Sequence, residues 1–472
     1  MNPLGTTLTL LMAAVVFLAP RRVAALAVFA AVCYLGLNQR ITVAGFNFTA
    51  ARVVLLAGFL RTLARGELRK LKLTNIDRPL LAFAIFSALM EGLRLGVWQE
   101  RVGIAYNVLL SYFVFRCLIT SLEEMWALLP KIALLIIPLA VCMVVESSTG
   151  KNLFSVIGAA DQQNTREGRL RCVGSFRGPH TAGIFGATLM PMFAALFCAG
   201  RQRRVAVAGL VAATAITYTS NSSGPLMAYA SGLVGFLFWP LRRDMKRVRW
   251  GILATLAGLA LVMKAPIWYL IAKISALTGG DGWHRSYLMA QCFKHFFDWW
   301  LVGTSDTSDW AVDLMPWGGA DITNMYVACA ASAGLGSLVL FVLILVRCFG
   351  NLGRALKAAR EMLPESEGLL WCCGTVLFAH VVTFFSVTYW DQLHVVWWGL
   401  LAMISSVTSD ILKPAPATEV ANEILEPVPS EAACQESIVP PAWRRDKPMQ
   451  TGASATASQR LDQSKGGRKD NG

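Results

Sequence analysis

The sequence predicts an all-α membrane protein, a polytopic bundle of about 12–13 transmembrane helices with one large extracytoplasmic loop. Of its 472 residues, 55% are hydrophobic and only 15% are charged, whereas soluble proteins have about 25% charged residues. The mean hydropathy is +0.51. Apolar runs of bilayer-spanning length recur from Leu4 to Ser409, and they lack the roughly ten-residue alternating segments of a transmembrane β-barrel.

Thirteen apolar segments account for this prediction, because each is hydrophobic over nearly the length of a membrane-spanning helix. In chain order they are Leu4–Ala19, Val23–Leu37, Thr49–Leu63, Pro79–Leu95, Gly103–Ile119, Leu128–Val145, Thr181–Ala199, Val205–Tyr218, Leu226–Leu241, Ile252–Tyr269, Met325–Phe349, Leu369–Val387 and Leu393–Val407. The first segment follows no basic stretch and has no evident cleavage site, so we expect a retained helix instead of a signal peptide.

Basic residues set the expected orientation. They gather in alternate short loops, as the positive-inside rule expects of cytoplasmic loops. These loops include Arg21, Arg65, Arg201, Arg243 and Arg354. The N-terminus is then outside and the C-terminus is cytoplasmic. The extracytoplasmic loops are then Ser147–His180, Ser220–Gly224, Lys264–Thr323 and Tyr389–Gln392.

The composition of the chain changes after the last apolar segment. Residues 1–412 form the predicted bundle, including the extracytoplasmic loops 147–180 and 264–323. Residues 413–472 are rich in Pro, Ala, Ser, Gln and Glu, with eight basic and eight acidic residues. Such a composition buries too little apolar surface to fold. We therefore expect a disordered cytoplasmic tail without chemistry of its own.

Several classes of function lack their sequence motifs. The eleven cysteines are spread along the chain with no CxxC and no Cys/His spacing for zinc, so no metal site is expected. There is no Walker motif, GxGxxG or metalloprotease signature, and we expect no cofactor. The net charge of +14 is spread over loops, which favours membrane lipids over nucleic acid as a partner.

The first extracytoplasmic loop is rich in arginine. Arg166, Arg169, Arg171 and Arg177 lie close together in the sequence, and Gly178-Pro-His180 then opens a helix. Arginine suits phosphate because its planar group donates two parallel hydrogen bonds, and a helix start offers free backbone N–H groups to an anion. The loop therefore predicts an anion site, with contact to lipid headgroups as the alternative.

Two further polar clusters lie on the same side of the membrane. Thr219–Pro225 is either a plain turn or the polar floor of a cavity. The largest loop contains Arg285, an amphipathic helix expected over Ser286–Trp300, and acidic residues that end at Asp321. The aromatic residues of that helix suit either the headgroup level or stacking on sugar rings. An acidic residue here could accept the proton of a sugar hydroxyl.

In order and spacing, these clusters resemble the motifs of the O-antigen ligase and O-antigen polymerase superfamily, which assembles bacterial surface polysaccharides. The resemblance spans Arg52–Phe349 and rests on Arg171-Cys-Val-Gly-Ser-Phe-Arg-Gly-Pro-His-Thr-Ala-Gly183, Ser222-Ser-Gly-Pro-Leu226, Arg285 with Phe297-Asp-Trp-Trp-Leu-Val-Gly303, and Asn324-Met-Tyr326 with Ala333-Gly-Leu-Gly336. The family's motifs are Arg-x-x-Gly-x-Phe-x-x-Pro, Ser-Arg-Gly at a helix start, an Arg with Pro-Leu-x-Gly, and His-Asn-x-Tyr-Leu followed by Gly-Leu-x-Gly. Ser223 stands in place of the family's Arg, and Thr323 in place of the His assigned as base in ligases.

The resemblance implies a GT-C-like glycosyltransferase of the bacterial inner membrane with a periplasmic active site. It would polymerise or ligate oligosaccharide units carried on undecaprenyl pyrophosphate during surface or exopolysaccharide assembly, without metal or nucleotide. Arg171 and Arg285 would stabilise the leaving pyrophosphate. Either Asp321 or His284 would take the place of the family's base, or the acceptor hydroxyl would need little activation. The substrate-binding residues implied are Arg169, Arg177, His180, Ser222, Ser223, His284, Thr323, Asn324 and Tyr326.

The expected partners are the lipid-linked oligosaccharide, membrane lipids, and a chain-length regulator or export complex. Two other classes of protein stay open: a polysaccharide or lipid transporter, and a non-catalytic scaffold of a synthesis complex. A transporter is expected to place paired charges near the middle of its helices and to contain internal repeats, and the sequence indicates neither. A scaffold leaves the clustered arginines unexplained.

Overall fold

The computed structural model divides the chain close to the end of the last apolar segment, into the units Met1–Lys413 and Pro414–Gly472. The structure describes residues 2–36, 40–43, 46–96, 98–159, 164–166, 168–278, 282–310 and 319–413. The predicted disordered tail therefore lies outside the described residues, apart from its first residue, Lys413.

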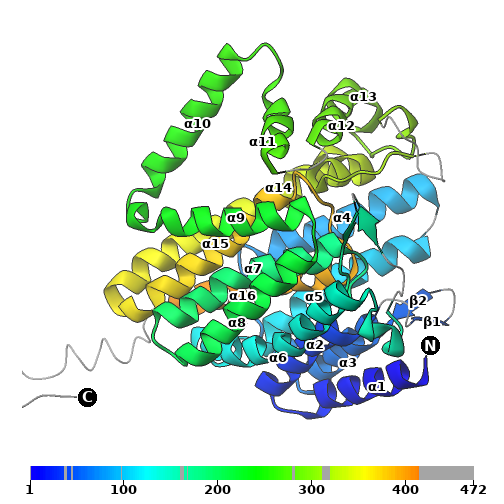
Figure 1. The fold of residues 1–472 in the computed structure, drawn as a ribbon, viewed down its shortest axis with the longest axis vertical. Coiled ribbons are helices and arrows are strands. Elements are labelled where there is room, and N and C mark those ends of the chain that lie inside the picture. The colour runs from blue at the N-terminus through cyan, green and yellow to red at the C-terminus, as the bar shows by residue number, and fades with distance from the viewer. Residues whose placement is uncertain are drawn as a thin grey trace, which may run out of the picture. The chain divides into compact units, whose positions relative to one another are not determined.

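Sixteen α-helices make up most of the described structure (Figure 1). Their bounds are α1 Pro3–Leu18, α2 Arg21–Tyr34, α3 Ala50–Ala64, α4 Asp77–Leu95, α5 Trp98–Leu118, α6 Leu122–Thr149, α7 Pro179–Cys198, α8 Arg203–Thr219, α9 Ser223–Leu237, α10 Met245–Val262, α11 Leu270–Thr278, α12 Gly282–Lys294, α13 Phe296–Trp299, α14 Met325–Met362, α15 Glu367–Thr383 and α16 Asp391–Ile411. Twelve of the thirteen predicted apolar segments each fall mainly on one of these helices, and Ile252–Tyr269 is divided by a bend. The prediction of an all-α bundle is therefore confirmed.

Two small antiparallel hairpins interrupt the helices, and neither was expected from the sequence. Strand β1 (Arg40–Val43) pairs with β2 (Phe46–Thr49) before α3. Strand β3 (Thr165–Arg166) pairs with β4 (Arg169–Leu170) in the loop between α6 and α7. The second hairpin contains two of the arginines that the sequence singled out.

Polar caps explain two helix starts. Helix α6 begins before the predicted Leu128 because Ser121 Oγ accepts a hydrogen bond from the backbone N–H of Glu124, at 3.2 Å, and this caps the first turn. Helix α14 begins after Asn324, whose Oδ1 accepts hydrogen bonds from the backbone N–H groups of Tyr326 (2.9 Å) and Val327 (3.1 Å).

Two predicted helices differ from the observed ones. The segment Ile252–Tyr269 is not one helix: α10 ends at Val262, and the chain from Ile267 continues at 101° to it. Pro266 lies in this bend, where it cannot continue the hydrogen-bonding pattern of α10. The amphipathic helix expected over Ser286–Trp300 is wrong as one element, because it begins earlier, at the start of α12, and breaks at His295 into α12 and α13.

Among the described residues, five helices are long and apolar enough to cross a membrane. They contain Arg101–Leu118, Leu122–Thr149, Pro179–Cys198, Met325–Met362 and Pro364–Thr383. The bent pair of Met245–Val262 and Ile267–Ile274 adds a sixth if it counts as one span. Some of the other predicted segments fall on shorter helices, such as the 17 residues of α8. Helices α4 and α16 are long enough, with 19 and 21 residues, but are not apolar enough. The protein is a helical membrane protein.

Helix α7 lies at the centre of the bundle and positions the candidate site. It packs against α8, α9 and α15, and 83% of its most apolar stretch is buried inside the bundle. Glycines allow this close approach: a Cβ atom at Gly183 would lie 2.3 Å from Ser220 Oγ, and one at Gly186 would lie 2.7 Å from the carbonyl oxygen of Ala213. The start of α7 is thereby held against the turn between α8 and α9.

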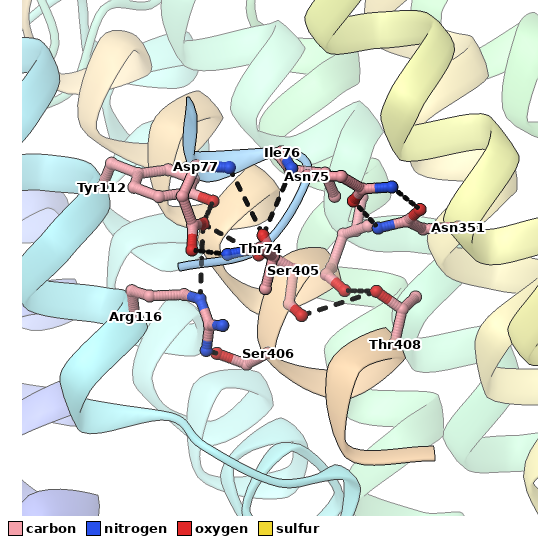
Figure 2. Close-up of polar contacts among 11 residues, drawn as sticks. Thr74, Asn75, Ile76, Asp77, Tyr112, Arg116, Asn351, Ser405, Ser406 and Thr408 are labelled. Carbon is pink, nitrogen blue, oxygen red and sulfur yellow. Dashed lines mark hydrogen bonds and ion pairs between the residues drawn. The ribbon is translucent and has the colours of Figure 1, made fainter. Parts of the chain in front are cut away.

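A buried polar network joins α4, α5 and α16 at the opposite end of α4 from Gly96 (Figure 2). Asp77 is fully buried. Its carboxylate accepts hydrogen bonds from the Tyr112 hydroxyl, from Ser405 Oγ (3.0 Å) and from the backbone N–H of Thr74 (2.7 Å). Asp77 lies in the first turn of α4, and the buried Arg116 lies in the last turn of α5. Both charges are therefore near helix ends, as expected for helices with nearly uncharged centres.

The large loop before α14 is anchored in a break of that helix. Gly334 has a φ of 80°, and the helical pattern is interrupted there. The backbone N–H of Leu335 donates to the carbonyl oxygen of Trp300 (2.8 Å), and that of Thr304 donates to the carbonyl oxygen of Ala331 (2.7 Å). The two segments Phe297–Gly303 and Ala333–Gly336, which were singled out separately in the sequence, therefore lie in contact.

Candidate functional site

A cavity of about 1200 Å³ opens at the end of the bundle where α7 and α9 begin. Its walls come from the loop before α7, the α8–α9 hairpin, α12, the segment before α14 and the segment between α15 and α16. The lining residues include Asn164, Arg166, Arg169, Arg171, Arg177, Gly178, His180, Thr214, Thr217, Tyr218, Asn221, Ser222, Ser223, Leu226, Tyr229, Arg285, Asp321, Thr323, Thr388 and Trp390. Polar clusters that lie far apart in the sequence thus meet around one space.

Nine of the twelve site residues predicted from the sequence line this cavity. They are Arg169, Arg171, Arg177, His180, Ser222, Ser223, Arg285, Asp321 and Thr323. The other three, His284, Asn324 and Tyr326, are not among its lining residues. The structure therefore brings together the arginines of two separate loops with one carboxylate.

Arg171 is half-buried in the wall formed by the loop before α7. Its Nη2 donates a hydrogen bond to Ser222 Oγ at 3.0 Å, which joins the first and second polar clusters. The adjacent backbone is fixed as well, because the N–H of Cys172 donates to the carbonyl oxygen of Thr219 at 3.1 Å. Burial, and then the positive charge of Arg166, lower the pKa of Arg171. An anion in the cavity would relieve both effects.

A buried carboxylate holds the loop that contains Arg171 and Arg177. The backbone N–H groups of Val173 and Gly174 donate to Glu146 Oε1 and Oε2 at 2.8 and 2.9 Å. Gln392 of α16 adds a hydrogen bond from its Nε2 to the carbonyl oxygen of Ser175, at 2.8 Å.

The loop that holds Arg171 and Arg177 is therefore rigid at its centre. Glu146 was not among the residues predicted from the sequence. The signal available in the sequence was that Glu146 is a single carboxylate near the end of a long apolar helix.

Arg177 lies at the rim and forms an ion pair with Asp391, at 3.2 Å. The Arg177 side chain is 64% exposed and that of Asp391 is 29% exposed. Asp391 has a φ of 53°, a left-handed conformation that is uncommon outside glycine and is tolerated best by Asn and Asp. Trp390, next in the chain, lines the cavity. Asp391 was not predicted, because the sequence offered no reason to place its short loop beside Arg177.

His180 is the second residue of α7 and lines the cavity. A Cβ atom at position 178 would lie 3.1 Å from its ring carbon Cε1. Gly178 therefore leaves room for the imidazole, which makes no hydrogen bond among the described residues.

Arg285 lies on α12 and lines the same cavity as the loop before α7. The following residue, Ser286, donates from Oγ to the carbonyl oxygen of Trp268 at 3.2 Å, which fixes the start of this helix. Asp321 is exposed and lines the same cavity. His284 does not line it; its Nε2 instead lies 3.5 Å from the backbone oxygen of Asp321. His284 thus supports the segment that contains Asp321.

Asn324 and Tyr326 have structural roles in the described protein. Asn324 is fully buried and caps α14. The Tyr326 hydroxyl donates to the carbonyl oxygen of Val381 at 3.0 Å. Together with the hydrogen bond from the backbone N–H of Met325 to the carbonyl oxygen of Phe384, at 2.9 Å, they join the start of α14 to the end of α15. They do not line the cavity, and their role in substrate binding stays a prediction.

The α8–α9 wall extends the cavity along the side of the bundle. The turn is short, with α8 ending at Thr219 and α9 beginning at Ser223. Deeper along the wall, Thr214 Oγ1 and the Tyr229 hydroxyl lie 2.9 Å apart. Tyr218 and Leu226 are 79% and 51% exposed on this wall. The cavity therefore combines a polar end with an apolar, exposed side.

The charge of the lining favours an anion. Five arginines line the cavity with one carboxylate, Asp321. The planar guanidinium groups suit phosphate or carboxylate oxygens, and no three His, Cys, Asp or Glu residues in the described part of the chain are placed to hold a metal ion.

The fold and the cavity define a class, namely a helical membrane protein with an arginine-lined cavity at one end of its bundle. No family model matches the chain, and no curated protein matches it either.

Proposed function

We propose that this protein is a membrane glycosyltransferase that polymerises, or ligates, oligosaccharide units carried on undecaprenyl pyrophosphate. The observation that carries the proposal is that Arg171, from the loop before α7, lines one cavity with Arg285 and Asp321, from the large loop before α14. In the orientation set by the basic loops, this cavity opens on the extracytoplasmic face of the bacterial inner membrane. The architecture is then GT-C-like, with the site built from extracytoplasmic loops.

Arg171 and Arg285 bind the pyrophosphate of the donor. An acceptor hydroxyl attacks the anomeric carbon, the bond between that carbon and the phosphate oxygen breaks, and the electron pair leaves with the lipid pyrophosphate. Negative charge grows on that oxygen in the transition state. Two guanidinium groups in fixed positions stabilise this charge.

Asp321 accepts the proton of the acceptor hydroxyl. It is the one carboxylate among the residues that line the cavity, and it lies on the same segment as Thr323. The backbone N–H of Thr323 donates to the carbonyl oxygen of Asp321 at 3.0 Å, so the segment is a tight turn. Ser222, beside Arg171, helps to orient the donor. The proton passes from Asp321 to water when the product leaves.

The α8–α9 wall supports a donor that arrives from the membrane. Its exposed side chains, Tyr218 and Leu226, are apolar or aromatic and line the same cavity as the arginines. The polyprenyl chain follows this wall while its pyrophosphate enters the polar end.

The two rival classes have weaker support. The buried ion pairs, such as Glu91 with Arg101 and Arg116 with Asp77, lie near helix ends. Transporters place such charges near the middle of the membrane. A scaffold does not require a loop held by Glu146 with arginines directed at a cavity.

The test is transfer by the purified full-length protein. It would be incubated with an undecaprenyl-pyrophosphate oligosaccharide, and products would be resolved by gel electrophoresis and mass spectrometry. We expect a ladder of repeat units and release of lipid pyrophosphate. Absence of turnover with this donor, when lipid and protein acceptors are also supplied, would contradict the proposal.

Variants locate the reaction in the cavity. Arg171→Ala and Arg285→Ala should each lower transfer by about 100-fold or more, because each removes a charge that acts on the leaving group. Arg249→Ala is the matched control, since Arg249 is exposed on α10 and is not among the cavity-lining residues. Normal transfer by a correctly inserted Arg171 or Arg285 variant would contradict the assignment.

A further inference from the structure

The β3–β4 hairpin places two arginines directly opposite each other at the cavity mouth. In this antiparallel pair, Arg166 is the cross-strand partner of Arg169. Directly paired residues project from the same face of a hairpin. Both arginines line the cavity, and both are exposed. We refer to Arg166 and Arg169 as the rim arginines.

The same face continues to Arg171. Residues two apart in a strand share a face, so Arg169 and Arg171 point the same way. The hairpin's pairing also extends to this position, because the backbone N–H of Arg171 donates to the carbonyl oxygen of Asn164 at 2.8 Å. Three guanidinium groups therefore follow one another from the mouth of the cavity toward its interior.

Like charges at directly opposite positions destabilise a hairpin. The lowered pKa of Arg171, caused first by burial and then by Arg166, reports the same repulsion one position further in. Thr165 and Leu170 are the other cross-strand pair of this hairpin, and neither is charged. Glu167, the residue that follows Arg166, lies outside the described residues. Two guanidinium groups on one face of a hairpin, both lining the cavity, also suit the oxygens of one anionic group bound between them.

The pyrophosphate does not require the rim arginines. Arg171 and Arg285 face it from two walls in the proposed mechanism, and Arg177 lies nearby in an ion pair with Asp391. The rim arginines lie farther toward the mouth, where the saccharide of a bound donor, or the growing chain, has to pass. An acidic group of the sugar would lie at that level, within reach of the rim arginines.

We propose that Arg166 and Arg169 bind an acidic substituent of the saccharide, a carboxylate or a phosphate, so that the oligosaccharide handled by this protein is anionic. This inference rests on the proposed function and adds the chemical class of the sugar. It makes the rim arginines determinants of specificity, separate from the groups that act on the leaving pyrophosphate.

Lipid headgroups are the other source of anionic oxygens near this hairpin. They would bind the rim arginines without regard to the sugar. Binding to soluble saccharides, measured with the protein in nanodiscs of phosphatidylcholine, separates the two sources. A parallel measurement in nanodiscs that contain phosphatidylglycerol shows whether anionic lipid competes.

The test uses three probes on the full-length protein, with binding measured by calorimetry. Trigalacturonate supplies carboxylates, maltotriose is the neutral control, and inorganic pyrophosphate reports the inner arginines. The wild type should bind trigalacturonate and pyrophosphate, and bind maltotriose at least about tenfold more weakly than trigalacturonate. The double variant Arg166→Gln/Arg169→Gln should lose about tenfold or more in affinity for trigalacturonate while it keeps its affinity for pyrophosphate.

Arg204→Gln is the matched control, because Arg204 is an exposed arginine at the other end of α8. Three results would overturn the inference: equal binding of maltotriose and trigalacturonate, unchanged trigalacturonate binding by the rim variant, or loss of trigalacturonate binding when phosphatidylglycerol occupies the hairpin. Loss of pyrophosphate binding by the rim variant would also overturn it, since the rim would then belong to the pyrophosphate site.

Failure of the proposed function gives a different pattern. A protein that binds trigalacturonate through the rim arginines but does not bind pyrophosphate through Arg171 supports the rim site and contradicts the glycosyltransferase. A protein that binds pyrophosphate and transfers sugar but ignores the acidic group leaves the glycosyltransferase in place and removes the inference.

Discussion

Asp77 and Arg116 form an ion pair inside the bundle, with 3.6 Å between Asp77 Oδ1 and Arg116 Nε (Figure 2). Their side chains are 0% and 6% exposed. Arg116 Nη1 also donates to Ser406 Oγ of α16 at 2.9 Å. Beside this pair, the amides of Asn75 and Asn351 exchange two hydrogen bonds, at 3.0 and 2.7 Å. The cluster thus joins α4, α5, α14 and α16.

Replacing Asp77 by Ala should destabilise the protein by about 3–5 kcal/mol, because it leaves the buried guanidinium of Arg116 without its carboxylate. The measurement is thermal or denaturant unfolding of the purified protein in detergent. Asp244→Ala is the control, since Asp244 pairs with Arg247 at the surface, where the side chains are 50% and 86% exposed, and such pairs contribute less than about 1 kcal/mol. Equal stability of the two variants would contradict this account.

Replacing Glu146 by Ala should weaken binding of inorganic pyrophosphate and lower transfer by about tenfold or more. The reason is that the backbone N–H groups of Val173 and Gly174 lose their acceptors, and buried donors without acceptors cost about 1–3 kcal/mol each. The loop that holds Arg171 would then rearrange. Glu146 is a positioning residue, so its effect should be mainly on the affinity for pyrophosphate.

Glu146→Gln keeps one acceptor oxygen and should retain part of this affinity, whereas an effect of charge alone would make Gln and Ala equivalent. Glu123→Ala is the matched control, because Glu123 lies on the same helix and is 82% exposed. Unaltered pyrophosphate binding by Glu146→Ala would show that the loop does not need this carboxylate.

The helices could be predicted from the sequence because hydrophobic length is a local property. Twelve of the thirteen apolar segments each fall mainly on one helix. The 101° bend after α10 was missed although Pro266 is a local signal for a helix break. The break at His295 could not be predicted, because it depends on what the neighbouring segments pack against. It also missed the β3–β4 hairpin, whose two-residue strands are too short to show an alternating pattern.

For the candidate site, the polar clusters were identified but the roles of single residues were not. Asn324 precedes a helix and is rich in hydrogen-bonding groups, and this pattern suits a helix cap as well as a ligand. In the structure Asn324 is buried and caps α14 through its side-chain oxygen. Glu146 and Asp391 act through contacts with a loop distant in sequence. No local pattern reports such contacts, since they exist only after the helices pack.

Replacing Gly334 by Ala should loosen the loop before α14. Gly334 has a φ of 80°, and a Cβ atom there would lie 2.6 Å from the carbonyl oxygen of Leu301. The new residue would combine an unfavourable backbone conformation, which costs about 1–2 kcal/mol, with a clash against backbone. We expect faster limited proteolysis between residues 264 and 323 and a lower unfolding midpoint. Gly350→Ala in the same helix is the control, because a Cβ atom there meets nothing within 4 Å.

The proposed orientation predicts which cysteines react from outside the cell. Cys198 is exposed at the end of α7, which the basic loops place in the cytoplasm, whereas Thr165 is exposed on β3. In a chain with Cys434→Ser, an impermeant maleimide should label Thr165→Cys in intact spheroplasts and Cys198 only after permeabilisation. Labelling of Cys198 alone in intact spheroplasts would mean that the orientation is inverted, and the cavity would then face the cytoplasm.

Cys172 serves as an internal control in the same experiment, because it lies in the loop before α7 but should stay unlabelled. It is fully buried, and burial is the first cause that raises the pKa of its thiol to about 11. The reactive thiolate therefore forms only as the pH rises toward that value, so labelling should be absent both at pH 7 and at pH 9. Reaction of Cys172 at pH 7 would show that the loop opens, and that Glu146 does not hold it as the structure describes.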